Sequence, residues 1–341
     1  MIIYGIDFGG TNLRIGEVNP ETGKLLKKSF SVPMNTIKTN NELTQIILSQ
    51  VGNAEKIGIS AAGNVDEKNL IIKMSPNSRI KEHITFGKTL KEKGFDVVMT
   101  NDMKAAVQGV ARFGEGKKYN NVLVATYSSG FNCAVTRDKI NTTAAELSHI
   151  IYKQNSDLFC GCGGIGHLDT YVSGNGAASM AKQYFFITKQ TNHTIMKLSL
   201  EEYNKKKNSK YTLEDLKKSD VFALIVTSIT SKHVYGAYSS NPNQEPQKHI
   251  KNIQVEAIAA SFGTMVSAFN PLDVMVLMGS QTKDWDILFK TAIKKYESSK
   301  TQYQLATLEK PKIIKTNLSD IGIIGAVAYY IITKTCKLSN K

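Results

Sequence analysis

Cysteine is scarce in this sequence, and long apolar runs are absent from it. Four of the 341 residues are Cys, and two of these, Cys160 and Cys162, are separated by a single residue. So few cysteines argue against a disulfide scaffold and favour a reducing compartment. No apolar run approaches the roughly 20 residues of a membrane span, and the first residues lack the basic segment of a signal peptide. We therefore expect a cytoplasmic protein with no membrane partner.

Motifs for nucleic-acid binding are also missing, although the formal net charge is +14. The sequence contains no zinc-finger spacing and no RNA-binding aromatic motif. Its lysines are spread along the chain, and acidic residues such as Glu201 and Glu214 stand among them. This mixture is typical of a solvated, Lys-rich surface, and attraction for polyphosphate ligands is a further interpretation of the charge. We expect no nucleic-acid partner.

The order of the predicted elements indicates an α/β protein with a repeated lobe. A chain of 341 residues is expected to form two lobes rather than one core. In the first half, strands are predicted at 2–7, 13–18, 24–32, 56–60 and 96–100, and helices at 41–51 and 102–113. A second strand–turn–strand unit follows at 121–127 and 132–137, with helices near 170–184, 213–237, 250–269 and 320–333 and a strand at 273–278. The polar, Lys-rich segment 190–212 is predicted to be exposed.

Four potential metal ligands lie close together in the middle of the chain. A histidine, two cysteines and a second histidine occur within nineteen residues. Two Cys with one residue between them rarely form a disulfide, whereas two thiolates and two imidazoles make a tetrahedral set that suits Zn²⁺. We predict a structural zinc site, and the alternative is a Gly-rich loop with incidental Cys and His. The predicted ligands are His149, Cys160, Cys162 and His167.

A Gly-Gly-Thr turn follows the first predicted strand. Gly9 and Gly10 allow backbone N–H groups to approach phosphate oxygens, and Thr11 adds a hydroxyl group. Asp7, at the end of the strand, is suited to face Mg²⁺, and Arg14 is suited to neutralise developing negative charge. The alternative is a plain Gly-Gly hairpin.

Three segments of the chain resemble motifs of the ROK family of sugar kinases and sugar-responsive repressors. Asp7–Arg14 is similar to Asp-x-Gly-Gly-Thr-x-x-Arg, Asn101–Ala106 to Asn-Asp-x-x-Ala-Ala, and Glu146–Asp169 to Glu-x-Gly-His, a spacer and Cys-x-Cys-Gly-x-x-Gly-Cys-x-Glu. The last segment differs from its motif by Ser148 for Gly, His167 for Cys and Asp169 for Glu. The resemblance spans nearly the whole chain. It implies a two-lobed actin-like ATPase (ribonuclease H-like) fold with a ligand cleft between the lobes.

The resemblance also implies an activity and assigns residues to it. The implied reaction is ATP-dependent phosphorylation of a hexose or N-acetylhexosamine, with ATP, Mg²⁺ and a structural Zn²⁺. Asp102 would be the base, whereas the local interpretation is a helix N-cap. The implied sugar-binding residues are Gly63, Asn77, Asn101, Asp102, Glu146, His149 and Asp169. The implied nucleotide-binding residues are Asp7, Gly9, Gly10, Thr11, Arg14, Thr126, Ser128, Gly130, Gly279 and Ser280.

The segment Thr126–Cys133 resembles the second phosphate turn of the family but departs from its pattern. Ser128 and Ser129 replace a glycine and a threonine, so the alternative function is a catalytically weakened or inactive sugar-binding protein of the same fold. The implied N-terminal lobe is 1–113, completed by a C-terminal helix at 320–341, and the implied C-terminal lobe is 114–319. The implied assembly is a homodimer or homotetramer.

Overall fold

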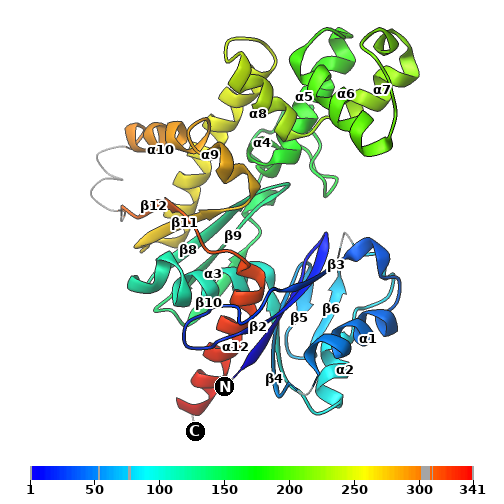
Figure 1. Ribbon diagram of the computed structural model, residues 1–341. Coiled ribbons are helices and arrows are strands. Elements are labelled where there is room, and N and C mark those ends of the chain that lie inside the picture. The colour runs from blue at the N-terminus through cyan, green and yellow to red at the C-terminus, as the bar shows by residue number, and fades with distance from the viewer. Residues whose placement is uncertain (1, 53, 76–77, 301–307, 309, 340–341) are drawn as a thin grey trace.

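Two five-stranded sheets form the framework of the computed structural model (Figure 1). It describes residues 2–339 except 53, 76–77, 301–307 and 309. The first sheet has the order β3-β2-β1-β4-β7, and the second has the order β10-β9-β8-β11-β12. The first consists of β1 (Ile3–Phe8), β2 (Asn12–Val18), β3 (Phe30–Pro33), β4 (Lys56–Ala61) and β7 (Asp96–Asn101). The second consists of β8 (Val122–Tyr127), β9 (Phe131–Arg137), β10 (Asn141–Ala145), β11 (Val274–Met278) and β12 (Lys312–Lys315).

Both sheets follow one pattern of strand pairing. β1 pairs antiparallel with β2 and parallel with β4, and β8 pairs antiparallel with β9 and parallel with β11. Nearly all residues of β1, β4, β8 and β11 are buried, as expected for strands covered on both faces. The turns after β1 and β8 therefore occupy equivalent places, at the carboxyl ends of parallel strands, where α/β proteins bind ligands. This architecture confirms the predicted fold class.

Two helices, α3 (Asp102–Phe113) and α12 (Ile321–Ser339), lie between the sheets (Figure 1). α12 packs on β1 and β4, α3 packs on β8 and β9, and the two helices contact each other. Glycines allow this close approach. A Cβ atom on Gly325 would lie 2.3 Å from the carbonyl oxygen of Ala105, and one on Gly58 would lie 2.2 Å from that of Ala326. The helix that begins at Asp102 is thus held against α12 at a fixed spacing.

Each of the remaining α-helices shares an apolar core with one of the two sheets. α1 (Asn40–Val51) and α2 (Phe86–Glu92) share an apolar core with the first sheet, as does the short hairpin of β5 (Asn64–Asp66) and β6 (Ile71–Met74). The second sheet shares its core with α4 (Asp169–Val172), α5 (Gly174–Thr188), α6 (Thr194–Lys207), α7 (Ser219–Thr227), α8 (Ser231–Ser240), α9 (Gln247–Phe269) and α10 (Phe289–Ser298). Among the described residues, no helix combines the length and apolarity needed to cross a membrane.

Three local expectations are wrong. Segment 190–212 is not an exposed excursion, because it contains α6, whose Ile195 and Met196 are buried while three of its four lysines lie in the last turn. The predicted helix 213–237 is broken between α7 and α8, and of the predicted strand 24–32 only the end belongs to β3. The average polarity of 190–212 concealed its few apolar positions. The break before α8 lacks Gly and Pro, so only the capping residue Thr230 marked it.

Candidate functional site

The first phosphate turn is built around the carboxylate of Asp7. This buried side chain lies one residue before the end of β1, and its Oδ2 accepts hydrogen bonds from Arg14 Nη2 at 2.6 Å and Arg14 Nε at 3.0 Å. Arg14 Nη1 also lies 3.4 Å from Oδ1 of Asp320, which directly precedes α12. Burial raises the pKa of Asp7, and the Arg14 guanidinium opposes that shift. A Cβ atom on Gly322 would lie 2.3 Å from Asp7 Cγ, so α12 closes over this carboxylate.

The predicted residues Gly9, Gly10 and Thr11 connect β1 to β2. The N–H of Gly9 donates to the carbonyl of Asn12 at 3.1 Å, and the carbonyl of Thr11 accepts the N–H of Met34 at 2.8 Å. The two glycines are half-buried and Thr11 is exposed. The turn is therefore held in place by backbone hydrogen bonds, one within the turn and one to Met34, while remaining accessible to a ligand.

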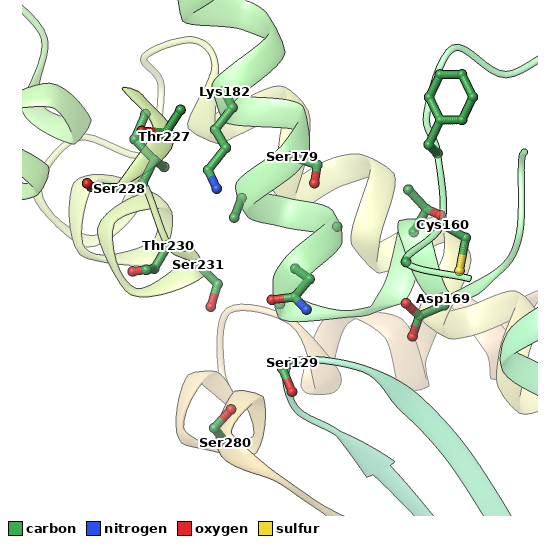
Figure 2. Close-up of a pocket in the computed structure, with 18 residues that line it drawn as sticks. Ser129, Cys160, Asp169, Ser179, Lys182, Thr227, Ser228, Thr230, Ser231 and Ser280 are labelled. Atoms are coloured by element: carbon green, nitrogen blue, oxygen red, sulfur yellow. The ribbon is translucent and has the colours of Figure 1, made fainter. Parts of the chain in front are cut away.

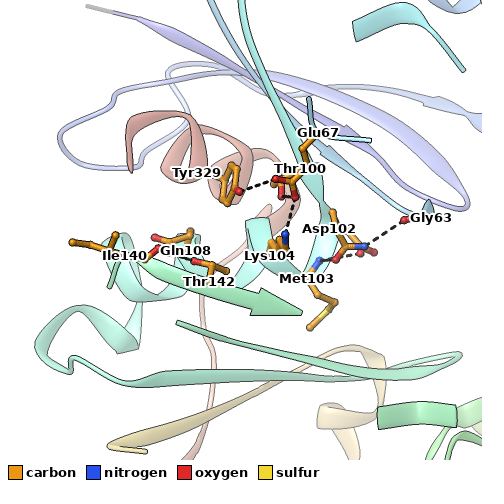
Figure 3. A network of polar contacts seen from close by, with 11 residues as sticks. Gly63, Glu67, Thr100, Asp102, Met103, Lys104, Gln108, Ile140, Thr142 and Tyr329 are labelled. Carbon is orange, nitrogen blue, oxygen red and sulfur yellow. Dashed lines mark hydrogen bonds and ion pairs between the residues drawn. The ribbon is translucent and has the colours of Figure 1, made fainter. Parts of the chain in front are cut away.

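Asp102 is the first residue of α3 (Figure 3). Its neighbour Asn101 caps that helix. Asn101 Oδ1 accepts the N–H of Met103 at 2.9 Å, so the N-cap is Asn101 rather than Asp102. Asp102 Oδ1 also accepts this N–H at 2.9 Å. The Asn101 amide donates from Nδ2 to the carbonyl of Gly63 at 3.5 Å. Three predicted site residues thus meet where β7 ends.

Asp102 shares its surroundings with two other carboxylates. Burial raises the pKa of Asp102 to about 6, and the negative charges of Asp7 and Glu146 contribute to that shift. Glu146 Oε2 accepts a hydrogen bond from Asn132 Nδ2 at 3.2 Å and lies 3.9 Å from His149 Nε2. Asp7, Asp102 and Glu146 come from distant parts of the sequence. The fold therefore brings the first turn, the start of α3 and the predicted metal segment into one electrostatic neighbourhood.

The four predicted metal ligands converge. Their donor atoms all lie within 4.8 Å of one another in the described structure. Cys162 Sγ is 3.2 Å from His167 Nδ1, and Cys160 Sγ is 3.9 Å from His149 Nδ1. Tetrahedral Zn–S and Zn–N bonds of about 2.3 and 2.0 Å would place neighbouring donor atoms about 3.3–3.8 Å apart. The donors therefore fit Zn²⁺ after a small contraction.

The segment His149–His167, which carries the four predicted metal ligands, depends on glycine at several positions. Gly163 has a φ of +91° and Gly166 a φ of +70°, in the left-handed region that side chains disfavour. A Cβ atom on Gly166 would lie 1.9 Å from the carbonyl oxygen of Lys153. One on Gly164 would lie 2.1 Å from the ring of His167. These glycines let the chain fold back so that the cysteines and histidines face one another.

The second phosphate turn closes without a left-handed residue. Within Ser128–Gly130 no φ is positive, and the N–H of the first residue donates to the carbonyl of the last at 2.9 Å. The carbonyl of Ser128 also accepts the N–H of Gly174 at 2.7 Å. Next to the turn, the N–H of Phe131 donates to Asp169 Oδ1 at 2.7 Å. The turn thus rests on the start of α5 and on the first residue of α4.

A cleft of about 550 Å³ opens beside this second turn (Figure 2). Ser129, Ser280, the start of α5 and the break between α7 and α8 line it. Lys182 extends toward its interior (Figure 2). Cys160 and Asp169 lie at another edge, so the metal segment borders the cleft. The hydroxyl-bearing lining residues are Ser129, Thr170, Ser179, Thr227, Ser228, Thr230, Ser231 and Ser280.

Other predicted residues flank this cleft or lie outside the described structure. Gly279 has a φ of +101°, and a Cβ atom there would lie 2.4 Å from the carbonyl oxygen of Tyr127. Thr126 lies in β8, just before the turn. All residues that line the cleft lie between Ser129 and Ser280, and Asp7 and Asp102 are not among them. Asn77 is outside the described residues.

Sequence reasoning missed three parts of the site. Asp320 was included only as the start of a helix, because its contact with Arg14 joins residues 306 positions apart. Lys182 and the segment 227–231 were hidden inside predicted helices. One local signal for the start of α5 was available in the sequence, because Ser173 precedes Gly-Asn-Gly. Its Oγ accepts the N–H of Gly176 at 3.1 Å, as the side chain of an N-cap residue does.

Comparisons with known proteins give matches over nearly the whole chain. The model of the ROK family matches residues 3–332. A glucokinase from Thermotoga maritima is 25% identical over 344 residues, which cover 96% of each chain. An N-acetyl-D-glucosamine kinase from Haemophilus influenzae is 22% identical over 351 residues, which cover 97% of this chain and 99% of the relative. The crystal structure of a ROK family glucokinase from Streptomyces griseus, in complex with glucose and AMPPNP, has a TM-score of 0.70 at 22% identity, covering 96% of this chain and 99% of that one.

Proposed function

Because this chain belongs to the ROK family and is an ATP-dependent sugar kinase, we propose that it phosphorylates a hydroxyl group of a hexose or N-acetylhexosamine, with Asp102 as the base. The observation that carries this proposal is the environment of Asp102. Asn101 supplies the cap of α3, and burial beside the charges of Asp7 and Glu146 raises the pKa of Asp102 to about 6. A side chain needed only as a cap would not require these surroundings.

The proton transfer follows from this pKa. Near neutral pH the Asp102 carboxylate is mostly ionised, yet it is a stronger base than an exposed Asp. It accepts the proton of the sugar hydroxyl as that oxygen forms a bond to the γ-phosphorus of ATP. The bond from the γ-phosphorus to the bridging oxygen breaks, and ADP leaves with the electron pair. The products are the sugar phosphate, ADP and protonated Asp102, which returns its proton to solvent.

We assign the sugar to the predicted residues around Asp102. Glu146 offers carboxylate oxygens to sugar hydroxyls, and its contact with Asn132 orients it. The zinc ion supplies a rigid anchor when His149, Cys160, Cys162 and His167 hold it. That anchor would fix His149, Glu146 and Asp169 relative to the sugar. The other proposed sugar-binding residues are Gly63, Asn77 and Asn101.

We assign ATP to the two turns and to the cleft beside the second. Its hydroxyl groups and Lys182 suit a polar, anionic ligand. Mg²⁺ would neutralise phosphate charge and would be faced by Asp7, while Arg14 stabilises the negative charge of the transition state. The other proposed nucleotide-binding residues are Gly9, Gly10, Thr11, Thr126, Ser128, Gly130, Gly279 and Ser280.

The test is ADP release measured with glucose, mannose and their N-acetylamino forms. At least one of these sugars should stimulate ATP turnover, and Asp102→Asn should lower kcat by about 10²–10⁴-fold with little change in Tm. Ser128 and Ser129 in place of the family's residues favour the alternative, an inactive sugar-binding protein. That alternative would be correct if calorimetry detected sugar binding but no sugar stimulated ATP turnover.

A further inference from the structure

The carboxylate of Glu67 joins three structural elements around Asp102 (Figure 3). Its Oε1 accepts hydrogen bonds from Thr100 Oγ1 at 2.8 Å and from Lys104 Nζ at 2.9 Å. Its Oε2 accepts the hydroxyl of Tyr329 at 3.1 Å. Thr100 belongs to β7, Lys104 to α3 and Tyr329 to α12, whereas Glu67 directly follows β5. One side chain therefore connects segment 63–67 to the strand and both helices at the junction.

These contacts lie on both sides of Asp102. Thr100 is two residues before it and Lys104 is two residues after it. Segment 63–67 is bound to the same junction at its other end, where Gly63 accepts the Asn101 amide at 3.5 Å. Gly63 has a φ of +123°, and a Cβ atom there would lie 2.2 Å from the carbonyl oxygen of Met74. The path of this segment is therefore fixed at both ends.

The surroundings of Glu67 limit the access of solvent to its hydrogen bonds. Thr100 is fully buried, and the side chain of Glu67 is only 32% exposed. Burial, followed by the negative charge of Glu67, raises the pKa of Tyr329 to about 12, so this hydroxyl remains a donor. Hydrogen bonds to an ionised carboxylate are shorter and stronger than neutral ones. Three donors thus hold one carboxylate in a single place.

We propose that Glu67 is a positioning residue that fixes the sugar-facing segment 63–67 relative to the Asp102 carboxylate. This inference rests on the proposed function, which assigns Gly63 to the sugar and Asp102 to the proton. A displacement of about 1 Å between reacting groups can cost about 10²-fold in rate. Glu67 touches no reacting atom and acts through the segment that it holds.

The chain offers a matched control at the other end of β7. Asp96 accepts hydrogen bonds from Tyr330 Oη at 2.6 Å and from Lys334 Nζ. This network, like that of Glu67, joins β7 to α12 through a carboxylate, a tyrosine and a lysine. Asp96 starts β7, however, whereas Asp102 follows the end of that strand. Asp96→Asn therefore reports what the loss of such a network does away from the site.

The experiment compares Glu67→Gln with Asp96→Asn in the full chain. Glutamine keeps the shape of Glu67 but removes its negative charge and replaces one acceptor oxygen by a donor, so at least one partner can no longer donate to it. Glu67→Gln should lower kcat/KM for the sugar at least tenfold and leave KM for ATP within twofold. Asp96→Asn should change kcat/KM less than twofold.

Two results would overturn the inference. One is an unchanged kcat/KM in Glu67→Gln, and the other is an equal loss in both variants, which would make Glu67 an ordinary structural contact. If Glu67→Gln does not fold, Lys104→Met, which removes only the ion pair, should lower kcat/KM at least threefold, and a smaller loss would contradict the proposal. Wild-type protein without sugar-dependent ADP release would refute the proposed function instead. Calorimetry would then decide the inference, with Glu67→Gln expected to weaken sugar binding at least tenfold.

Discussion

The two phosphate turns occupy equivalent places in two sheets of the same strand order, yet different parts of the chain stabilise them. The first turn is largely self-contained, because Asp7 and Arg14 come from the two strands that it joins. The second turn has no such pair. Asp169 accepts the N–H of Phe131, and Gly174 donates to Ser128, so the starts of α4 and α5 support it.

The first turn is therefore determined mainly by neighbouring residues in the sequence, whereas the second depends on tertiary contacts. The first turn can be assigned from eight consecutive residues. The second depends on residues about 40 positions away, and one of them, Asp169, lies only two residues after the predicted metal ligand His167. Loss of the metal should therefore disturb the second turn as well as the sugar side, while leaving the first turn intact.

Of the changes that test this comparison, removal of the metal should alter the kinetics most. The wild type is expected to contain roughly one equivalent of Zn²⁺, and Cys160→Ala or Cys162→Ala should lose it. Both variants should also lower kcat/KM by about 10²-fold or more, because the residues that contact the ligands would no longer be held in place. KM should rise for both ATP and the sugar. Metal analysis and kinetics test this, with Cys336→Ser on α12 as the control. Folded wild-type protein that contains no zinc would contradict the prediction.

Substitution of Asp169 should have an effect of intermediate size. It should separate the contact of Asp169 with Phe131 from its proposed contact with the sugar. Asp169→Ala removes the acceptor for the Phe131 N–H and should raise KM for ATP about tenfold, as expected when a hydrogen bond to a charged group is lost. Asp169→Asn retains an acceptor oxygen and should change KM for ATP less than threefold. A rise in KM for the sugar with both variants is expected from the proposed sugar contact. If Asp169→Ala left KM for ATP unchanged, the contact with Phe131 would not support the turn.

Ser128→Gly should have the smallest effect. The turn contains no positive φ, so glycine gains no conformational advantage there and KM for ATP should change less than threefold. Steady-state kinetics at saturating sugar measures this change. A tenfold decrease in KM would show instead that the Ser128 side chain obstructs the phosphates and that the second turn is weakened.

The sequence predicts most of what is local in this protein. The Gly-Gly-Thr turn, the strand before Asp102 and the cluster of Cys and His each lie within a short segment whose chemistry is visible in its residue types. Contacts that link distant segments were not predictable in the same way. Arg14 with Asp320, and Glu67 with Tyr329, depend on where α12 packs between the sheets. The walls of the cleft were missed because the break at 228–230 carries no helix-breaking residue.

The pH dependence of kcat/KM for the sugar tests the role of Asp102 most directly. The pKa of this carboxylate is raised to about 6, and only its ionised form accepts a proton. Activity should therefore be low near pH 5, rise with an apparent pKa of about 6, and level off toward pH 8. Glu146→Gln removes a charge that raises this pKa and should shift the acidic limb to lower pH. A wild-type profile that is flat from about pH 5 to pH 8 would contradict the assignment of Asp102 as the base.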